Sequence, residues 1–203
     1  VQGVTNLKKA EHEIIADRIV AGTYIIAALM LNSALEINNF NTIYLKSLID
    51  ILKKMGAKLK VSKNSIKVSK GSKLKSTSLS TSPYPGFPTD LQAQLMSLMC
   101  ISDGKSKIKE TIFENRFMHV PELNRLGANI TVEKDTATII GNQTFKGAQV
   151  MASDLRASIS LVLAAMNANG QTTLNRVYHL DRGYENIEKT LGSLGAKIKR
   201  QKN

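Results

Sequence analysis

The segment PYPGFPTDLQ brings a threonine and an aspartate, Thr89 and Asp90, to the start of an expected helix. Its three prolines stiffen the approach, because each fixes its own φ and restricts the preceding residue to extended conformations. Both polar residues therefore enter the helix with little conformational freedom, which suits a carboxylate that must be held in place. A rigid loop whose aspartate only caps the helix explains the local sequence as well.

Two arginines lie at strand-to-helix junctions, where α/β proteins commonly collect polar groups. Arg116 is in the motif FENRFMHVPEL, and Arg182 occupies the equivalent junction in YHLDRGYE. A guanidinium presents paired planar donors that suit a carboxylate or a phosphate. Two arginines at equivalent junctions therefore predict an anion site. The alternative for Arg116 is a surface pair with Glu114 or Glu122.

The motif ASDLRASIS places Asp154 and Arg156 in the first turn of another expected helix. A cation so near a helix N-terminus is opposed by the helix dipole. A residue whose charge is unfavourable for its position in a helix is a candidate for a functional role. Arg18, which follows Asp17, is the matching feature earlier in the chain. For both arginines, a pair with the neighbouring aspartate remains the alternative.

The other reactive side chains indicate no metal and no cofactor. His12, His119 and His179 are isolated and lack zinc-ligand spacing. His119 and His179 each lie three residues from a motif arginine and could line the same cleft, although a packed histidine is more common. Cys100 lies in the apolar segment LQAQLMSLMC, which favours a buried thiol over a nucleophile. The chain has no phosphate-binding glycine loop.

The net charge of +12 first suggests a nucleic-acid partner, but its distribution favours none. The chain has 21 Lys and 7 Arg, and the lysines are scattered along expected strands and helix faces. Aromatic residues make up only 5%, so stacking platforms for single strands are scarce. A lysine-rich solvated surface explains the charge better.

The sequence also predicts a cytoplasmic protein without a membrane segment. The first residues, VQGVTNLKKAEHE, contain no apolar stretch typical of a signal peptide. No apolar run approaches the roughly 20 residues that a membrane helix needs. A single cysteine fits a reducing compartment.

Three segments that repeat the same features must position these side chains. Each begins at an aspartate and ends at a glycine followed by alternating residues: Asp17 to Gly56, Asp90 to Gly127, and Asp154 to Gly195. Within each, an apolar helix precedes a strand, a second helix and a hairpin. The glycine suits the C′ position that ends the second helix. The unit is βαβαββ in some cyclic order, with approximate limits 11–80, 81–150 and 151–203.

The third repeat is incomplete, because it stops after AKIKR without a partner strand. The segment HEII, residues 12–15, could supply one strand, but the number of strands still falls short. We therefore expect this chain to be part of a longer one, or to be completed by another domain. The alternative is a third repeat that is merely shorter.

The strings PYPGFPTDLQAQ, FENRFMHVPEL, ASDLRAS and YHLDRGYE together resemble the C-terminal part of enolpyruvyl transferases of the UDP-N-acetylglucosamine 1-carboxyvinyltransferase family. The resemblance covers essentially the whole chain. It implies an inside-out α/β barrel of repeated βαβαββ units, with residues 1–203 as one C-terminal domain of a two-domain enzyme. Such an enzyme has its active site between the domains, and a short N-terminal segment completes the second one.

The resemblance also implies an activity. Family members transfer the enolpyruvyl group of phosphoenolpyruvate to the 3′-hydroxyl of UDP-N-acetylglucosamine and release phosphate, the first committed step of peptidoglycan synthesis. Asp90 matches the carboxylate proposed to deprotonate the sugar hydroxyl. Two residues, Thr89 and Ile112, match contacts to the UDP-sugar, and Phe113 lies beside them. Isoleucine at position 112 replaces the more usual valine.

The remaining matches describe an anionic-substrate site. Arg116, Arg156 and Arg182 match this domain's contribution to phosphoenolpyruvate binding, and Asp154 matches the acidic residue that holds their network. The general-acid loop of the family belongs to the other domain, so we expect this chain alone to be inactive. Cys100 lies in the wrong context to be the cysteine of that loop.

Two other functions remain open at this point. The chain could belong to another enolpyruvyl transferase of the same fold, such as the shikimate-phosphate type. It could also be a non-catalytic basic binding module, for which the net charge is the supporting feature. In that case the motif arginines would be irrelevant and binding would fall steeply with salt.

Overall fold

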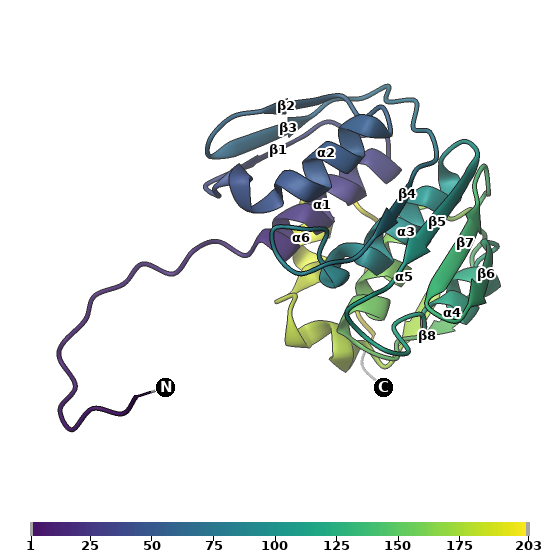
Figure 1. The fold of residues 1–203 in the computed structure, drawn as a ribbon. Coiled ribbons are helices and arrows are strands. Elements are labelled where there is room, and N and C mark those ends of the chain that lie inside the picture. Colours follow the sequence, from purple (N-terminus) through teal and green to yellow (C-terminus); the bar gives the residue numbers. More distant parts are fainter. Residues whose placement is uncertain (1, 202–203) are drawn as a thin grey trace.

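The computed structural model describes residues 2–201 (Figure 1). Residues 2–17 form no helix or strand and run outward from the rest of the chain. The expectation that residues 12–15 supply a strand is therefore wrong. All four of their side chains are exposed, so no buried apolar face fixes this segment against a sheet.

The middle repeat contains every element of the predicted unit. In chain order these are β4 (Ser78–Ser80), α3 (Gln92–Ile101), β5 (Lys105–Lys109), α4 (Val120–Arg125), β6 (Asn129–Glu133) and β7 (Thr136–Ile140). The strands form a sheet in the order β4-β5-β7-β6. β4 runs parallel to β5, and the other pairs are antiparallel. The predicted βαβαββ unit is confirmed here.

The outer repeats build parts of the same unit. The first comprises α1 (Arg18–Met30), β1 (Leu35–Asn38), α2 (Lys46–Lys54), β2 (Leu59–Val61) and β3 (Ser65–Val68), with sheet order β1-β3-β2. The third comprises β8 (Gln149–Met151), α5 (Leu155–Asn167), β9 (Thr173–Asn175) and α6 (Ile187–Ser193). Within residues 2–201, no strand lies beside β1 as β4 lies beside β5, and residues 196–200 form no strand.

The short strands β4 and β8 each pair with the strand that follows the next long helix. Each therefore belongs to the sheet of the repeat that follows it. Of the approximate limits 11–80, 81–150 and 151–203, the first falls directly after β4 and the second falls inside β8. The treatment of residues 1–203 as one domain stays a prediction.

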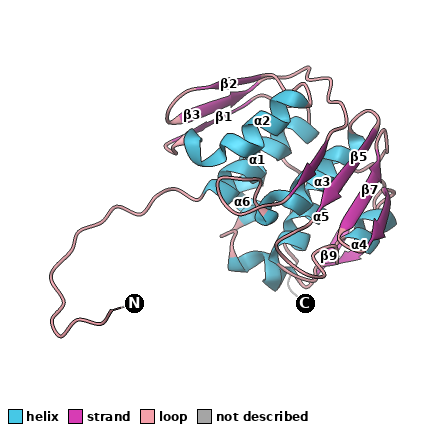
Figure 2. Ribbon diagram, in the orientation of Figure 1, coloured by secondary structure: helices cyan, strands magenta, loops and turns pink. Residues whose placement is uncertain are grey.

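Helices occupy the middle of the molecule and the sheets lie outside them (Figure 2). α1, α3 and α5 contact one another, one from each repeat. Nine of the ten residues of α3 are buried, because helices and sheets surround it on all sides. A helix that is largely apolar all round is typical of such a central position.

The glycines predicted to end the second helix of each repeat do so. Gly56, Gly127 and Gly195 follow α2, α4 and α6 with φ of +98°, +101° and +98°. Glycine adopts this left-handed conformation without the steric cost of a Cβ atom. The repeats therefore share their stop signal as well as their order of elements.

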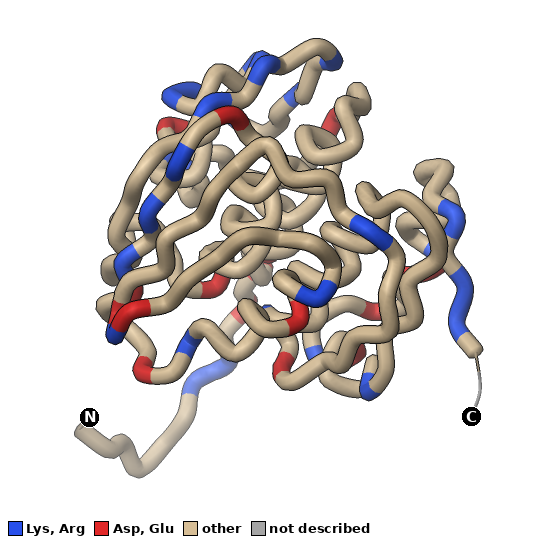
Figure 3. Tube along the Cα trace, turned by 90° about the vertical axis from the view of Figure 1, so that its right-hand side faces the viewer, with Lys and Arg blue, Asp and Glu red and all other residues tan. Residues whose placement is uncertain are grey.

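Lys and Arg positions are distributed along the trace rather than gathered in one block (Figure 3). On β5, for example, Lys105, Lys107 and Lys109 are exposed while the alternate residues are buried. None of the helices described is both long and apolar enough to cross a bilayer.

Candidate active site

Asp90 lies in a short 3₁₀ helix, η2 (Thr89–Leu91), that precedes α3. Its Oδ1 accepts hydrogen bonds from Arg116 Nη2 at 3.1 Å and from Arg156 Nε at 3.0 Å. No side-chain cap is made at the start of η2 or of α3. The interpretation of Asp90 as only a helix cap is therefore wrong, and three separate sequence motifs meet at one oxygen atom.

Arg116 comes from the loop between β5 and α4. It follows Asn115, which adopts a left-handed conformation with φ of +53° that asparagine tolerates better than most residues. Its side chain is only 18% exposed, and its guanidinium carbon lies 5.2 Å from the centre of the Phe113 ring. Arg116 pairs with Asp90 and not with Glu114 or Glu122.

The side chains of Asp154 and Arg156 have different partners at the start of α5. Asp154 Oδ1 accepts from the backbone N–H groups of Arg156 and Ala157 at 2.8 and 2.9 Å, which makes it the N-cap. The Arg156 side chain, 20% exposed, turns away to Asp90. Asp154 therefore fixes the backbone of Arg156, and the alternative of a side-chain pair between the two does not occur.

Thr89, Ile112 and Phe113 lie close to this cluster through a shared partner. The Thr89 hydroxyl and the backbone N–H groups of Ile112 and Phe113 all donate to the carboxylate of Glu110. The side chains of Ile112 and Phe113 are 40% and 59% exposed. Together they form an exposed apolar rim on the loop that carries Arg116.

Arg182 is the one predicted site residue that the structure does not bring to Asp90. It is exposed at the end of the 3₁₀ helix η3 (Val177–Arg182). Among the described residues it has no acidic partner, and the neighbouring Asp181 pairs with Arg200 instead, at 2.6 and 2.8 Å. Arg182 therefore offers a free guanidinium near the edge of the third repeat.

His119 lies beneath the cluster, as a packed histidine. It is 2% exposed, and its Nε2 has no hydrogen-bond partner among the described residues. Burial lowers the pKa of its imidazole to about 4, opposed by the charge of Asp154 and assisted by that of Arg116. A neutral imidazole at this position adds no positive charge beside the two arginines.

Glu110 is the residue that sequence reasoning missed. It is buried although it is a glutamate, and it directly follows β5. A signal was present, because the inward-facing residues of β5 are Ser106 and Ile108, so the next inward position is Glu110. An acidic residue at an inward-facing position of a strand needs hydrogen-bond partners for its carboxylate, and it is therefore a candidate for a functional role.

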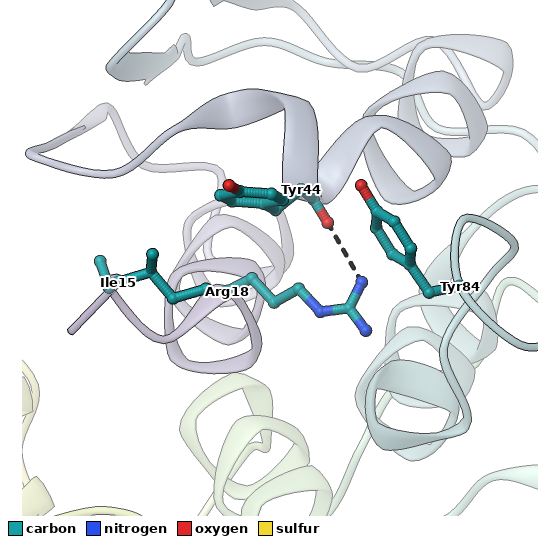
Figure 4. A pocket seen from close by; sticks show the side chains of 5 residues that line it. Ile15, Arg18, Tyr44 and Tyr84 are labelled. Carbon is teal, nitrogen blue, oxygen red and sulfur yellow. Dashed lines mark hydrogen bonds between the residues drawn. The ribbon is translucent and has the colours of Figure 1, made fainter. Parts of the chain in front are cut away.

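Arg18 is the counterpart of Arg156 in the first repeat, but its side chain contacts Tyr44 and Tyr84 (Figure 4). Its Nη1 donates to the Tyr44 carbonyl at 3.2 Å, and its guanidinium carbon lies 5.0 Å from the centre of the Tyr84 ring. With Ile15 and Ala16 these residues line an open cavity of about 240 Å³. The side chain of Arg18 does not pair with Asp17, so that alternative is also wrong.

Cys100 is buried in α3, and desolvation raises the pKa of its thiol to about 12. A thiol that stays protonated and out of reach of solvent is a poor nucleophile. This agrees with the prediction that Cys100 packs rather than reacts.

The comparison with known families decides the relationship. The profile described as EPSP synthase (3-phosphoshikimate 1-carboxyvinyltransferase) matches residues 1–191. The chain belongs to this family. The predicted resemblance to enolpyruvyl transferases is thereby confirmed.

The curated relatives of this family member carry a more specific name. A UDP-N-acetylglucosamine 1-carboxyvinyltransferase of Pelagibacter ubique is 53% identical over 98% of this chain and 48% of the relative. A UDP-N-acetylglucosamine 1-carboxyvinyltransferase 2 of Mesorhizobium japonicum is 51% identical over the same shares. The chain thus spans about half the length of the curated relatives it matches.

Solved structures of family members confirm the fold. The enolpyruvyl transferase NikO from Streptomyces tendae aligns with a TM-score of 0.85 at 30% identity, over 92% of this chain and 44% of that one. An EPSP synthase from Acinetobacter baumannii aligns with a TM-score of 0.75 at 16% identity, over 93% and 48%. At that identity the second likeness concerns the fold alone. The predicted inside-out α/β barrel of repeated units is confirmed.

Proposed function

We propose that this chain forms one half of an enzyme that transfers enolpyruvyl from phosphoenolpyruvate to the 3′-hydroxyl of UDP-N-acetylglucosamine. The single observation that carries the proposal is the meeting of Arg116 and Arg156 on one oxygen of Asp90. The identity of 50–53% to relatives named for this activity supports the acceptor. The same reasoning makes the protein a cytoplasmic participant in peptidoglycan synthesis, without a nucleic-acid partner.

Asp90 is the base in this proposal. Its Oδ1 is occupied by the two arginines, while its side chain remains 43% exposed and no described residue donates to Oδ2. Oδ2 accepts the proton of the sugar hydroxyl as that oxygen attacks C2 of phosphoenolpyruvate. A proton added to the methylene carbon completes the tetrahedral ketal. Loss of phosphate from C2 and of a proton from the methyl group then gives the enolpyruvyl ether.

The arginines bind the anionic donor. Arg116 and Arg156 present guanidinium groups in a partly enclosed setting, where electrostatic stabilisation is stronger than in water. Arg182, exposed and unpaired among the described residues, would add a third cation when substrate is present. Asp154 holds the backbone of Arg156, and Thr89, Ile112 and Phe113 form the side toward the UDP-sugar.

The other half of the enzyme is the proposed partner. It would supply the acid that protonates the methylene carbon, since Cys100 is buried and no other described residue beside Asp90 is suited to that task. The chain alone should therefore bind substrate weakly and release no phosphate.

A chimera tests the proposal. The matched 48% of the Pelagibacter ubique relative is replaced by this chain, and phosphate release from phosphoenolpyruvate is measured with each acceptor. We expect turnover with UDP-N-acetylglucosamine and none with shikimate 3-phosphate. Turnover with shikimate 3-phosphate would support the other enolpyruvyl transferase activity. A folded chimera that is inactive, beside an active parent enzyme, would contradict the proposal.

A further inference from the structure

Glu110 is a buried carboxylate with four hydrogen-bond donors around it. Its Oε1 accepts from the Thr81 hydroxyl at 2.7 Å and from the N–H groups of Ile112 and Phe113 at 2.9 and 3.2 Å. Its Oε2 accepts from the Thr89 hydroxyl at 2.9 Å. The side chain therefore ties together the segment after β4, the start of η2 and the loop after β5.

The position of Glu110 is itself fixed by the sheet. Its backbone N–H donates to the Asp135 carbonyl at 2.7 Å. The next residue, Thr111, donates from its N–H to the Thr81 hydroxyl at 2.8 Å and from its own hydroxyl to the Thr81 carbonyl at 2.6 Å. The carboxylate thus stands on a rigid base rather than on a mobile loop.

This arrangement is a costly way to stabilise a fold. Glu110 is 4% exposed, and among the residues described no cationic nitrogen lies within 4.0 Å of it. A buried charge without a counterion loses hydration that hydrogen bonds only partly replace. An apolar residue at this inward-facing position, like Ile108 before it, would fill the same space without that loss.

The four bonds end on residues that adjoin the candidate site. Thr89 directly precedes Asp90 in η2, and Ile112 and Phe113 begin the loop that carries Arg116. One carboxylate therefore sets the distance between the segment of the base and the segment of the apolar rim. An error of about 1 Å in such a distance can lower a rate roughly a hundredfold.

We propose that Glu110 is a positioning residue that holds the Asp90 turn and the Ile112–Phe113 loop in register for the sugar-nucleotide acceptor. The proposal rests on the function proposed above. It assigns Glu110 to the acceptor side, because the bonds reach Thr89, Ile112 and Phe113. The arginines that face the anionic donor are held instead by Asp90.

The first experiment needs no catalysis. Amide hydrogen exchange is measured in the 203-residue chain for the wild type, Glu110→Ala and the matched control Ile108→Ala on the same strand. The N–H groups of Ile112 and Phe113 should exchange at least about tenfold faster in Glu110→Ala, because their acceptor is lost. In Ile108→Ala they should keep their protection relative to neighbouring amides. Equal loss in both variants would overturn the proposal.

The second experiment separates the two substrates. In the chimera described above, Glu110→Gln and Glu110→Ala should raise the KM for UDP-N-acetylglucosamine by about tenfold or more, and more than the KM for phosphoenolpyruvate. Gln should be the milder change, because its oxygen can still accept from both backbone N–H groups. Ile108→Ala should lower thermal stability without this split.

The outcomes distinguish this proposal from the one on which it rests. Equal effects on both KM values, or none, would overturn the positioning role while leaving the transferase activity intact. An inactive chimera with the wild-type chain would contradict the transferase activity, whereas the exchange data would still report whether Glu110 orders the loop.

Discussion

The three aspartates that begin the repeats do different things. Asp17 and Asp154 cap their helices, each accepting two backbone N–H groups through Oδ1: at 2.7 and 3.3 Å for Asp17, and at 2.8 and 2.9 Å for Asp154. Asp90 makes no cap and accepts two arginine side chains instead. The same residue type at the same place in the repeat caps a helix twice and pairs with arginines from other segments once.

The difference arises from one extra turn of 3₁₀ helix. In the middle repeat η2 stands between Pro88 and α3, so Asp90 lies inside that turn rather than before the helix. A cap uses the carboxylate on local N–H groups, and a carboxylate released from capping can reach groups from other repeats. A small local change in a repeated scaffold thus frees one carboxylate to pair with side chains from other segments.

Asp90→Asn in the chimera should give the largest effect. The variant keeps the shape of the side chain but removes the proton acceptor, so kcat should fall by about 10²- to 10⁴-fold. The matched control is Asp17→Asn, where asparagine caps a helix as well as aspartate does. Steady-state phosphate release measures both, and similar rates for the two variants would contradict the distinction.

Arg156→Lys should give the second-largest effect. A lysine cannot reproduce the geometry of Nε donating to Asp90 while the rest of the guanidinium faces the donor, so kcat/KM for phosphoenolpyruvate should fall on the order of a hundredfold. Arg18→Lys changes the same residue type at the first helix start, where Arg18 pairs with no acidic side chain among the described residues. It should leave kcat/KM within about threefold of the unmodified chimera. Comparable losses in both would contradict the assignment of Arg156 to the donor.

His119 gives a test through pH, because burial lowers the pKa of its imidazole, with the charges of Asp154 and Arg116 acting in opposite directions. Its pKa is lowered to about 4 in the fold, so the unfolded chain binds the proton more readily. The stability due to neutral His119 is complete above about pH 6.5 and is lost as the pH falls toward 4. Between pH 7 and 5, the wild type should lose roughly 2 kcal/mol more of its free energy of unfolding than His119→Leu. Denaturant titrations at both pH values measure this, and parallel losses would contradict it.

The smallest effects concern the stability that Asp154 and Asp90 contribute to the chain. Asp154→Ala should lower the free energy of unfolding of the 203-residue chain by about 1 kcal/mol, since two N–H groups lose their acceptor. Asp90→Ala should lower it by about 0.5 kcal/mol or less, because its ion pairs are partly exposed. Urea denaturation compares them. A greater loss for Asp90→Ala would mean that its pairs are mainly structural.

Repetition made much of the fold predictable. The helix-ending glycines, the βαβαββ unit and the three polar motifs follow from spacing and residue type. The possible strand at residues 12–15 does not form, because all four residues are exposed and give the segment no buried face to pack against a sheet. The sequence also left open whether Asp90 is a cap, since the extra turn before α3 depends on how Pro88 and the flanking segments pack. Glu110 was missed because two of its four partners, the hydroxyls of Thr81 and Thr89, lie 29 and 21 residues away along the chain.

The burial of α3 has a consequence for how this chain can change. Only Ile101 of that helix is not fully buried, so a substitution almost anywhere along it meets packed neighbours. The exposed positions of β5 offer no such resistance. Tolerance to substitution should therefore be concentrated in the outer sheets. The sequence of α3, which directly follows the candidate base, should change most slowly in evolution.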